Sequence, residues 1–378
     1  MESTKEQQSI RGYMIFAAAV TLTLIGALTM SSFQQGNPFF IRQLIWLCIS
    51  SVVFFAASQV DWRILRRTGV AVGIYGVATG LLLLLFVIGK TFLGADSWFS
   101  FGLFSFQPIE LASLALIIVL AKYFSRRHIE IANIRHILVS GAYAFILFLI
   151  VALQPDFGGA IIIFCVWLCM VLVSGISRTH LLTVITIGAV AFAGLWSFGF
   201  HEYQRQRVLN FLHPLADVRG TGYNALQSTI AVGSGQLIGK GIGYGTQSKL
   251  RFLPEYQTDF MFAAFSEEWG FCGVLLLFVL YGVLFFLLLS IAVRGATNVE
   301  MLFVLGVLFY LAAHFILHVG INMGILPVTG TTIPFMSYGG SHLFIEFLML
   351  GIVAGMDKYG NAAHRDMVKA EFSGGYDV

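Results

Sequence analysis

Residues 266–293 of the chain read SEEWGFCGVLLLFVLYGVLFFLLLSIAV. After its two glutamates the run is uncharged, and it is longer than the roughly 20 residues that an α-helix needs to cross a bilayer. Its apolar residues are continuous and do not alternate with polar ones, which indicates a helix and not a strand of a membrane barrel. The stretch therefore predicts a membrane-spanning helix.

Apolar runs of this kind recur along the whole chain, which is 58% hydrophobic and only 11% charged. Soluble proteins average about 25% charged residues, so we predict an all-α polytopic membrane protein that forms a single integral-membrane domain over residues 1–378. A polar N-terminal segment precedes a full-length apolar run, so no cleaved signal peptide is expected. The ten predicted spans cover residues 12–30, 40–58, 68–88, 108–123, 137–153, 159–176, 180–200, 266–293, 301–322 and 335–356.

The distribution of charge predicts the orientation of these spans. With the N-terminus in the cytoplasm, 14 of the 22 Lys and Arg residues fall on the cytoplasmic side, and six of the other eight lie between residues 201 and 259. Basic residues concentrate in cytoplasmic loops of membrane proteins. We therefore expect both termini in the cytoplasm and a large extracytoplasmic loop, residues 201–259, between the seventh and eighth spans.

This loop is basic and rich in glycine, which runs against the general charge trend. An anionic ligand is one reason, and the tendency of long loops to cross regardless of charge is the other. Gly239-Lys240-Gly241 can hold phosphate oxygens through backbone amides and one positive charge, although the P-loop pattern is absent and a flexible connection is the alternative. Residues 203–211 read as an amphipathic surface segment that carries Arg205 and Arg207.

Carboxylates stand at the outer mouths of several predicted spans. Asp259 opens the eighth span, and Glu110 and Asp156 each follow a Gln-Pro pair. Ionisable groups at membrane depth are costly and by default mark a pathway or a site, while a simple helix cap is the alternative for Asp259. Three more acids lie at or inside predicted spans: Glu267, Glu268 and Glu346.

Histidines and cysteines lie within the predicted spans. His314 and His318 are four residues apart on the ninth span, as are His342 and Glu346 on the tenth. Facing each other they would form a metal site, but interhelical hydrogen bonds or cavity lining are favoured. The four cysteines are all in spans, so no disulfide framework is expected.

A set of motifs in fixed order resembles the SEDS (shape, elongation, division and sporulation) family over nearly the whole chain. The motifs are QPIE at 107–110, QPD at 154–156, YNALQS at 223–228, AVGSG at 231–235, GKG at 239–241, GTQS at 245–248, FLPE at 252–255, TDF at 258–260, SEEWGF at 266–271, NMG at 322–324, LPVTG at 326–330 and SYGGS at 337–341.

The resemblance implies a peptidoglycan glycosyltransferase that polymerises lipid II at the outer face of the bacterial cytoplasmic (inner) membrane during cell elongation. The family's catalytic aspartate falls on Asp259, which would act as general base on the acceptor hydroxyl. Lys240, Arg205 and Arg207 are expected to stabilise the departing pyrophosphate, and a divalent cation, Mg²⁺ or Mn²⁺, is a candidate cofactor. The remaining candidate substrate-binding residues are Gln247, Glu110, Asp156 and Ser337.

The chain departs from the family pattern in its basic residues. The lysine expected three residues after Glu110 is Ser113, and the basic pair expected before Trp98 is Asp96-Ser97. Each departure removes positive charge from the outer side, which bears on how the pyrophosphate is bound.

The resemblance also implies partners: a class B penicillin-binding transpeptidase, lipid II, membrane lipid and other proteins of the elongation complex, with no nucleic acid. A second hypothesis stays open, that the chain is a lipid II flippase or a non-catalytic scaffold, because many spans and intramembrane acids suit transport as well.

Overall fold

The computed structural model describes residues 2–32, 38–88, 90–92, 95–101, 104–125, 134–194, 196–197, 202–213, 222–250 and 252–373. Ten helices correspond to the ten predicted spans: α1 (Glu2–Ser31), α2 (Pro38–Ser58), α3 (Thr68–Ile88), α4 (Pro108–Ser125), α5 (Ile134–Leu153), α6 (Phe157–Val173), α7 (Arg178–Gly194), α11 (Met261–Val293), α12 (Asn298–Asn322) and α13 (Gly340–Ser373).

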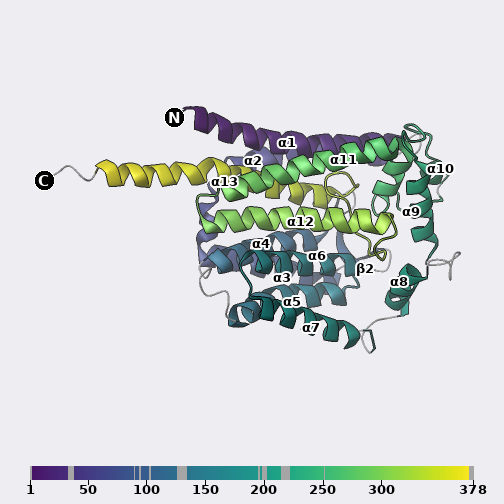
Figure 1. Ribbon diagram of the computed structural model, residues 1–378, viewed down its shortest axis with the longest axis horizontal. Helices are drawn as coiled ribbons and strands as arrows, with labels where there is room; N and C mark the ends of the chain where they lie inside the picture. Colours follow the sequence, from purple (N-terminus) through teal and green to yellow (C-terminus); the bar gives the residue numbers. More distant parts are fainter. Residues whose placement is uncertain are drawn as a thin grey trace.

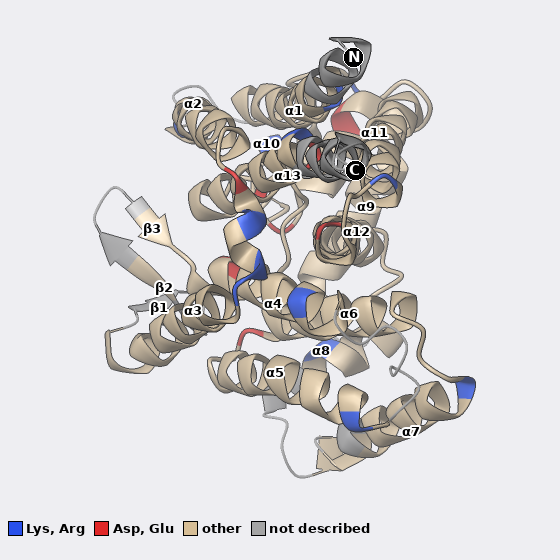
Figure 2. Cartoon of the chain, turned by 90° about the vertical axis from the view of Figure 1, so that its left-hand side faces the viewer, with Lys and Arg blue, Asp and Glu red and all other residues tan. Residues whose placement is uncertain are grey.

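The helical, multi-pass fold is confirmed. Among the described residues, eight helices are long and apolar enough to cross a membrane, and α6 and α7 are shorter apolar helices. Figure 1 shows them as one elongated bundle, with the start of α1 and the end of α13 at the same end. We call this the terminal end and the opposite end the loop end. Figure 2 views the bundle from the terminal end, with Lys and Arg residues, in blue, at several helix ends.

Several helices have bounds that differ from the predicted spans. α11 begins at Met261 instead of 266, α13 runs from Gly340 to Ser373 instead of over 335–356, and α1 begins at Glu2 instead of 12, while residues 195 and 198–200 of the seventh predicted span lie outside the described residues. Phe335 and Met336 are apolar, but Phe335 has a left-handed φ of 61°, which an α-helix excludes. Hydropathy alone does not detect such a turn.

The segment predicted as one large loop contains three helices at the loop end of the bundle: α8 (Glu202–Leu212), α9 (Tyr223–Ser234) and α10 (Thr246–Lys249). The predicted amphipathic segment is thus a helix, α8. Residues 201, 214–221 and 251, which include the basic Arg219 and Arg251, lie outside the described residues.

The α3–α4 connection at the loop end contains a small antiparallel sheet that the sequence did not predict. Its strands pair in the order β1-β2-β3. Phe99, Ser100 and Phe101 pair with Phe106, Ser105 and Phe104. The strands are β1 (Lys90–Phe92), β2 (Ala95–Phe101) and β3 (Phe104–Phe106), and the short 3-10 helix η1 (Trp62–Arg66) precedes α3.

Ion pairs close the terminal end of the bundle. Arg11 of α1 reaches Asp357 of α13 at 2.9 Å, and Arg66 of η1 reaches Glu300 of α12 at 2.6 Å. Both acids are almost fully buried while each arginine keeps some exposure. The pairs therefore join helices that are far apart in sequence at the end opposite the candidate site.

Close packing against α1 predicts a matched pair of glycine variants. A Cβ at Gly26 would lie 2.3 Å from the backbone oxygen of Met336, whereas one at Gly73 of α3 meets nothing within 4 Å. We expect Gly26→Ala to destabilise the protein by about 1–3 kcal/mol, the usual effect of overpacking, and Gly73→Ala to leave it unchanged or slightly more stable. Thermal unfolding in detergent measures both, and equal effects would contradict the packing of α1 on the turn before α13.

Candidate active site

Asp259 lies in a tight turn that leads into α11 at the loop end. The carbonyl oxygen of Glu255 accepts the amides of Thr258 at 3.1 Å and Phe260 at 3.2 Å, so the chain doubles back just before α11 begins. Glu255 has the left-handed φ of 47° that this turn requires. Phe260 is buried, whereas Asp259 is half-buried. The turn therefore holds the Asp259 carboxyl group at the mouth of the helix and not inside it.

Asn322, the last residue of α12, fixes this turn from two sides. Its Nδ2 donates to the backbone oxygen of Asp259 at 3.0 Å, and its Oδ1 accepts the amide of Ala263 at 3.1 Å. Asn322 is fully buried, and buried polar groups need such partners. One side chain therefore satisfies backbone groups on both sides of the start of α11.

The segment before α13 holds the same turn from the other side. Ser337 Oγ donates to the backbone oxygen of Thr258 at 2.8 Å, and the amide of Tyr338 donates to the oxygen of Gln257 at 2.8 Å. Ser337, predicted to bind substrate, thus positions the residue next to Asp259. Its contact with substrate stays a prediction.

The surroundings of Asp259 change its acidity. Its pKa is raised to about 7, first by burial and next by the negative charge of Glu255; Arg207 opposes this rise, Asp156 adds to it and a hydrogen bond from Thr258 lowers it. A carboxyl group with a pKa near the working pH combines a useful deprotonated fraction with real basicity. The electrostatics suit a general base.

Asp156 belongs to the same electrostatic cluster. It caps α6, since its Oδ1 accepts the amide of Gly159 at 2.9 Å, and its Oδ2 accepts Nε2 of Gln107 at 3.3 Å. Burial raises the pKa of Asp156, and Arg207 acts in the opposite direction. Arg207 therefore acts on both Asp259 and Asp156, which brings three of the predicted site residues together.

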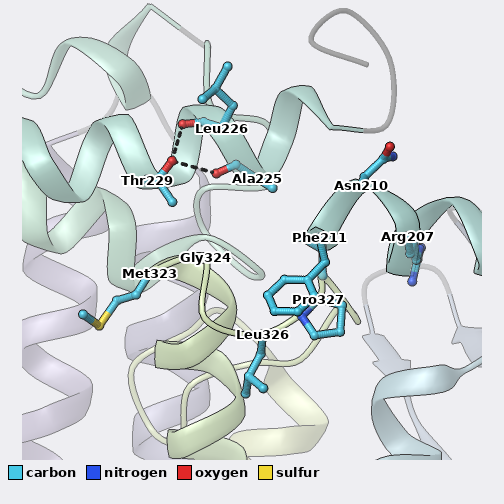
Figure 3. Close-up of a pocket in the computed structure, with 11 residues that line it drawn as sticks. Arg207, Asn210, Phe211, Ala225, Leu226, Thr229, Met323, Gly324, Leu326 and Pro327 are labelled. Atoms are coloured by element: carbon cyan, nitrogen blue, oxygen red, sulfur yellow. Dashed lines mark hydrogen bonds between the residues drawn. The ribbon is translucent and has the colours of Figure 1, made fainter. Parts of the chain in front are cut away.

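A pocket of about 130 Å³ opens beside Arg207 (Figure 3). α8 supplies Arg207, Asn210 and Phe211 to its wall, and the Phe211 ring lies next to Pro327 of the segment after α12. Most of the wall is apolar while Arg207 brings positive charge. Its other lining residues are Ala225, Leu226, Thr229, Met323, Gly324, Leu326 and Val328. The pocket can therefore accommodate a group that is partly apolar and partly anionic.

The glycine-rich segment after α9 packs its backbone against a break in α11. Gly270 has a φ of 65° and interrupts the helix, and the amides of Lys240 and Gly241 donate to the oxygens of Glu267 and Glu268, each at 3.0 Å. A Cβ on Gly270 would lie 2.1 Å from a backbone nitrogen of the segment. Glycine is required here because two backbones meet, and not because the segment is a loose connection.

Glu267 accepts hydrogen bonds from amides that follow the glycine-rich segment. Its carboxylate accepts the amides of Thr246 at 2.9 Å and Gln247 at 3.1 Å, and it pairs with Lys240 Nζ at 2.7 Å. The amides predicted to hold phosphate, those of Lys240 and Gly241, donate instead to the backbone oxygens of Glu267 and Glu268. The predicted phosphate cradle is therefore wrong for these two amides, and the substrate roles of Lys240 and Gln247 stay predictions.

The last two predicted site residues have different surroundings. Arg205 of α8 donates from Nη2 to the backbone oxygen of Ser197 at 3.1 Å on the exposed side of the loop region. Glu110, in the first turn of α4, is buried, accepts a short hydrogen bond from Tyr310 and lies 2.9 Å from Nδ1 of His342. Only Glu110 of these two lies inside the bundle.

The interhelical hydrogen bonding favoured for the buried histidines is confirmed for His318. Nδ1 of His318 lies 2.7 Å from the backbone oxygen of Thr331, and its Nε2 accepts the amide of Phe262 at 3.3 Å. Both ring nitrogens of His318 are therefore used to join α12 to its neighbours.

Sequence reasoning missed Asn322 and Glu255 as site residues. Both stand in motifs of the family pattern, NMG and FLPE, but nothing in their spacing indicates that Asn322 holds the Asp259 turn or that Glu255 raises its pKa. A polar residue at the end of a predicted span was the available signal for Asn322. The side chains of Asp96 and Ser97 lie outside the described residues, so their effect stays untested.

The helical bundle and its cluster of acids and arginine define a multi-pass membrane protein with a polar site at one end. A family model described as cell cycle protein, covering FtsW, RodA and SpoVE, matches residues 9–362. The chain belongs to this family, as the SEDS motifs predicted.

Characterised relatives and solved structures agree with this assignment. The peptidoglycan glycosyltransferase MrdB of Escherichia coli K12 is 35% identical over 312 residues, which cover 82% of this chain and 84% of MrdB. The rod shape determining protein RodA of Thermus thermophilus matches with a TM-score of 0.69 and 28% identity, over 92% of this chain and 96% of RodA.

A second solved structure is part of a peptidoglycan synthase complex described as coordinating polymerization and crosslinking. Its chain matches with a TM-score of 0.79 and 28% identity, covering 92% of this chain and 97% of that one. These names confirm the predicted enzyme class, a peptidoglycan glycosyltransferase.

The Lys240–Glu267 ion pair predicts that removing both charges destabilises the protein less than removing Lys240 alone. Glu267 is fully buried and Lys240 is 30% exposed, so Lys240→Met leaves a buried carboxylate without its cation. We expect a loss between the roughly 1 kcal/mol of an exposed pair and the roughly 3–5 kcal/mol of a fully buried one. The double variant Lys240→Met/Glu267→Gln should recover much of it in thermal unfolding, and a double variant no more stable than the single one would contradict this role.

Proposed function

We propose that this protein polymerises lipid II into glycan strands, with Asp259 as the general base. In the reaction the acceptor sugar hydroxyl oxygen forms a bond to the anomeric carbon of the donor, while the bond from that carbon to the pyrophosphate oxygen breaks. Asp259 takes the hydroxyl proton, and undecaprenyl pyrophosphate leaves with the bonding electrons. A single displacement inverts the anomeric centre and needs no covalent sugar–enzyme intermediate.

The observation that carries this proposal is the Asp259 carboxyl group itself. It is half-buried at the mouth of α11, has a pKa of about 7 and is fixed through its backbone by Asn322. A structural helix cap would hydrogen-bond its side chain to the first amides of the helix, whereas the residue that caps α11 is Phe260, without a side-chain hydrogen bond. The carboxylate of Asp259 thus has no capping role to explain it.

Arg207 is the basic residue best placed to stabilise the departing pyrophosphate. It lines the pocket and its charge acts on Asp259 and Asp156, whereas Lys240 is paired with Glu267. Preorganised positive charge near the leaving group lowers the barrier to its departure. The apolar wall of the same pocket suits the first part of the prenyl chain.

The proposal extends to location and partners. We expect the inner membrane with both termini in the cytoplasm, which would turn the loop end and Asp259 outward. The match to a chain of a complex that joins polymerization to crosslinking supports a class B penicillin-binding transpeptidase as partner. A role in elongation, as opposed to division, is the choice that its similarity to MrdB and RodA supports.

Replacing the carboxyl group tests the role of Asp259. The variant Asp259→Asn keeps the shape of the side chain but cannot take up the proton, so glycan chains from lipid II should fall by at least about a hundredfold, the scale of general-base catalysis. The assay uses the purified protein with its transpeptidase, and product length is read on a gel. Size-exclusion behaviour and thermal unfolding should match the unaltered protein. Undiminished product would favour the flippase or scaffold hypothesis.

The pH dependence of polymerisation tests the electrostatic environment of Asp259. Because the base must be deprotonated, activity should rise as the pH increases through about 7, the pKa of Asp259. Glu255→Gln removes a negative neighbour that raises this pKa, so the acidic limb should move to lower pH. Arg207→Gln removes a positive neighbour that lowers it, so the limb should move to higher pH.

Glu255→Gln and Arg207→Gln are controls for each other, because they should shift the pH profile in opposite directions. Shifts of opposite sign in the pH profile of kcat/KM are expected, alongside a higher KM for lipid II in Arg207→Gln alone. Profiles that coincide with that of the unaltered protein would show that another group is the base.

A further inference from the structure

Three side chains from three helices meet in the interior of the bundle, below the turn that carries Asp259. They are Glu110 of α4, His314 of α12 and His342 of α13, and their ligand atoms lie within 4.8 Å of one another. All three are buried, with exposures of 5%, 6% and 3%. The geometry points to a binding site for one divalent transition-metal ion, held by two imidazole nitrogens and one carboxylate oxygen.

The spacing within the cluster is compatible with a metal ion. Nδ1 of His342 and Oε1 of Glu110 are 2.9 Å apart. Metal–ligand bonds of about 2.0–2.2 Å place adjacent ligands of an octahedral ion roughly 3 Å apart. These two atoms therefore already have the separation of neighbouring ligands, and His314 has to move inward to complete the set.

Each histidine is also oriented by its other nitrogen. Nδ1 of His314 lies 3.3 Å from the backbone oxygen of Thr332, and because a carbonyl can only accept, Nδ1 carries the proton and Nε2 keeps a free electron pair. Nε2 of His342 lies 3.0 Å from Oε1 of Glu346. Metal-binding histidines almost always donate their second nitrogen to a carbonyl or carboxylate; His314 has such a partner, and for His342 a carboxylate lies within reach.

The cluster is incompletely satisfied without an ion. Nε2 of His342 and Oε1 of Glu346 are not aligned for a hydrogen bond, and neither has another partner. Oε2 of Glu346 is held by the amide of Phe335 at 2.9 Å, so the His342 ring is the part that can turn. A small rotation of this ring toward an ion would also align its Nε2 with Glu346.

Charge balance is compatible with the same conclusion. Glu110 and Glu346 are buried in the apolar bundle, where uncompensated charge is strongly unfavourable. With both carboxylates ionised and both histidines neutral, one divalent cation makes the cluster electrically neutral. The alternative is that two protons balance the charge, one bound to His342 as an imidazolium and one bound to a carboxyl group.

The donor set selects the kind of ion. Mg²⁺ and Mn²⁺ suit oxygen ligands, and Mg²⁺ retains several waters, whereas imidazole nitrogen suits Zn²⁺, Fe²⁺, Cu²⁺ and Ni²⁺. The two-histidine donor set therefore selects an ion of the second group over Mg²⁺ or Mn²⁺, the two candidate cofactors expected from the family chemistry. A bound ion would tie α4, α12 and α13 together about two helical turns from Asn322, which holds the Asp259 turn.

Metal analysis of the purified full-length protein tests this site independently of catalysis. The protein is stripped with a chelator in detergent, equilibrated with Co²⁺ or Zn²⁺ and freed of unbound ion, and its metal content is measured. We expect about one ion per chain, visible ligand-field bands with Co²⁺ and a higher unfolding temperature with the ion. Glu110→Gln, His314→Ala and His342→Ala should each lose most of the bound ion.

Matched controls separate the site from chance binding and from catalysis. His318→Gln lies one turn from His314 but removes a ring whose two nitrogens are already bonded to backbone groups, so it should retain the ion. Asp259→Asn should also retain it, because the proposed base is not a ligand. X-ray absorption of the unaltered protein should show nitrogen and oxygen ligands at about 2.0–2.2 Å.

The site is disproved if the unaltered protein stays metal-free at millimolar Co²⁺, or if His314→Ala and His342→Ala bind as much ion as His318→Gln. Should either histidine variant fail to fold, the metal content and absorption spectrum of the unaltered protein still decide the question.

Discussion

The hydrogen bonds of Asn322 to the start of α11 are the interaction on which the candidate site depends. A helix that begins at the mouth of an apolar bundle leaves its first amides without partners within the helix, and burying unpaired backbone groups of this turn is costly. Asn322 satisfies one group on each side of the turn, through Asp259 and Ala263. The turn is held through the backbone oxygen of Asp259. Its carboxyl group is therefore not needed to hold the turn.

The requirement that buried polar groups have hydrogen-bond partners also explains the glycine-rich segment. The break in α11 at Gly270 leaves backbone groups that amides of the segment satisfy, and the buried Glu267 is neutralised by Lys240 and two further amides. A motif that looks like an anion-binding loop is thus completed by an acid of its own chain. Arg207 of α8, by contrast, lies in the wall of the pocket, and its charge acts on Asp259.

Hydropathy predicted the ten helices because membrane spans are defined by composition and length, which one sequence shows. It could not predict which faces meet. Asp259 and Asp156 were both found as acids at helix mouths, but their shared neighbour Arg207 comes from a helix inside the predicted loop. Nothing in the sequence distinguishes Tyr310 from the other residues of its span. Its hydrogen bond to Glu110 depends on the packing of α12 against α4. Likewise, α11 begins five residues before the predicted span. Met261–Phe265 form a buried first turn of the helix, and the charged Glu267 and Glu268 hide this turn from a hydropathy analysis.

The lysine of the family pattern is absent beside Glu110, and a histidine from another helix lies next to this carboxylate. Ser113 stands where the family pattern has a lysine near Glu110, and it is buried at 2% exposure, so the first cation after Glu110 on α4 is Lys122, in the last turn of the helix. The structure supplies His342 from α13 instead, 2.9 Å from the same carboxylate. A histidine differs from a lysine in one decisive respect, since it can lose its proton and become a metal ligand. Beside Glu110 this chain therefore has a histidine that can bind either a proton or a divalent ion, and the charge there depends on which of them is bound.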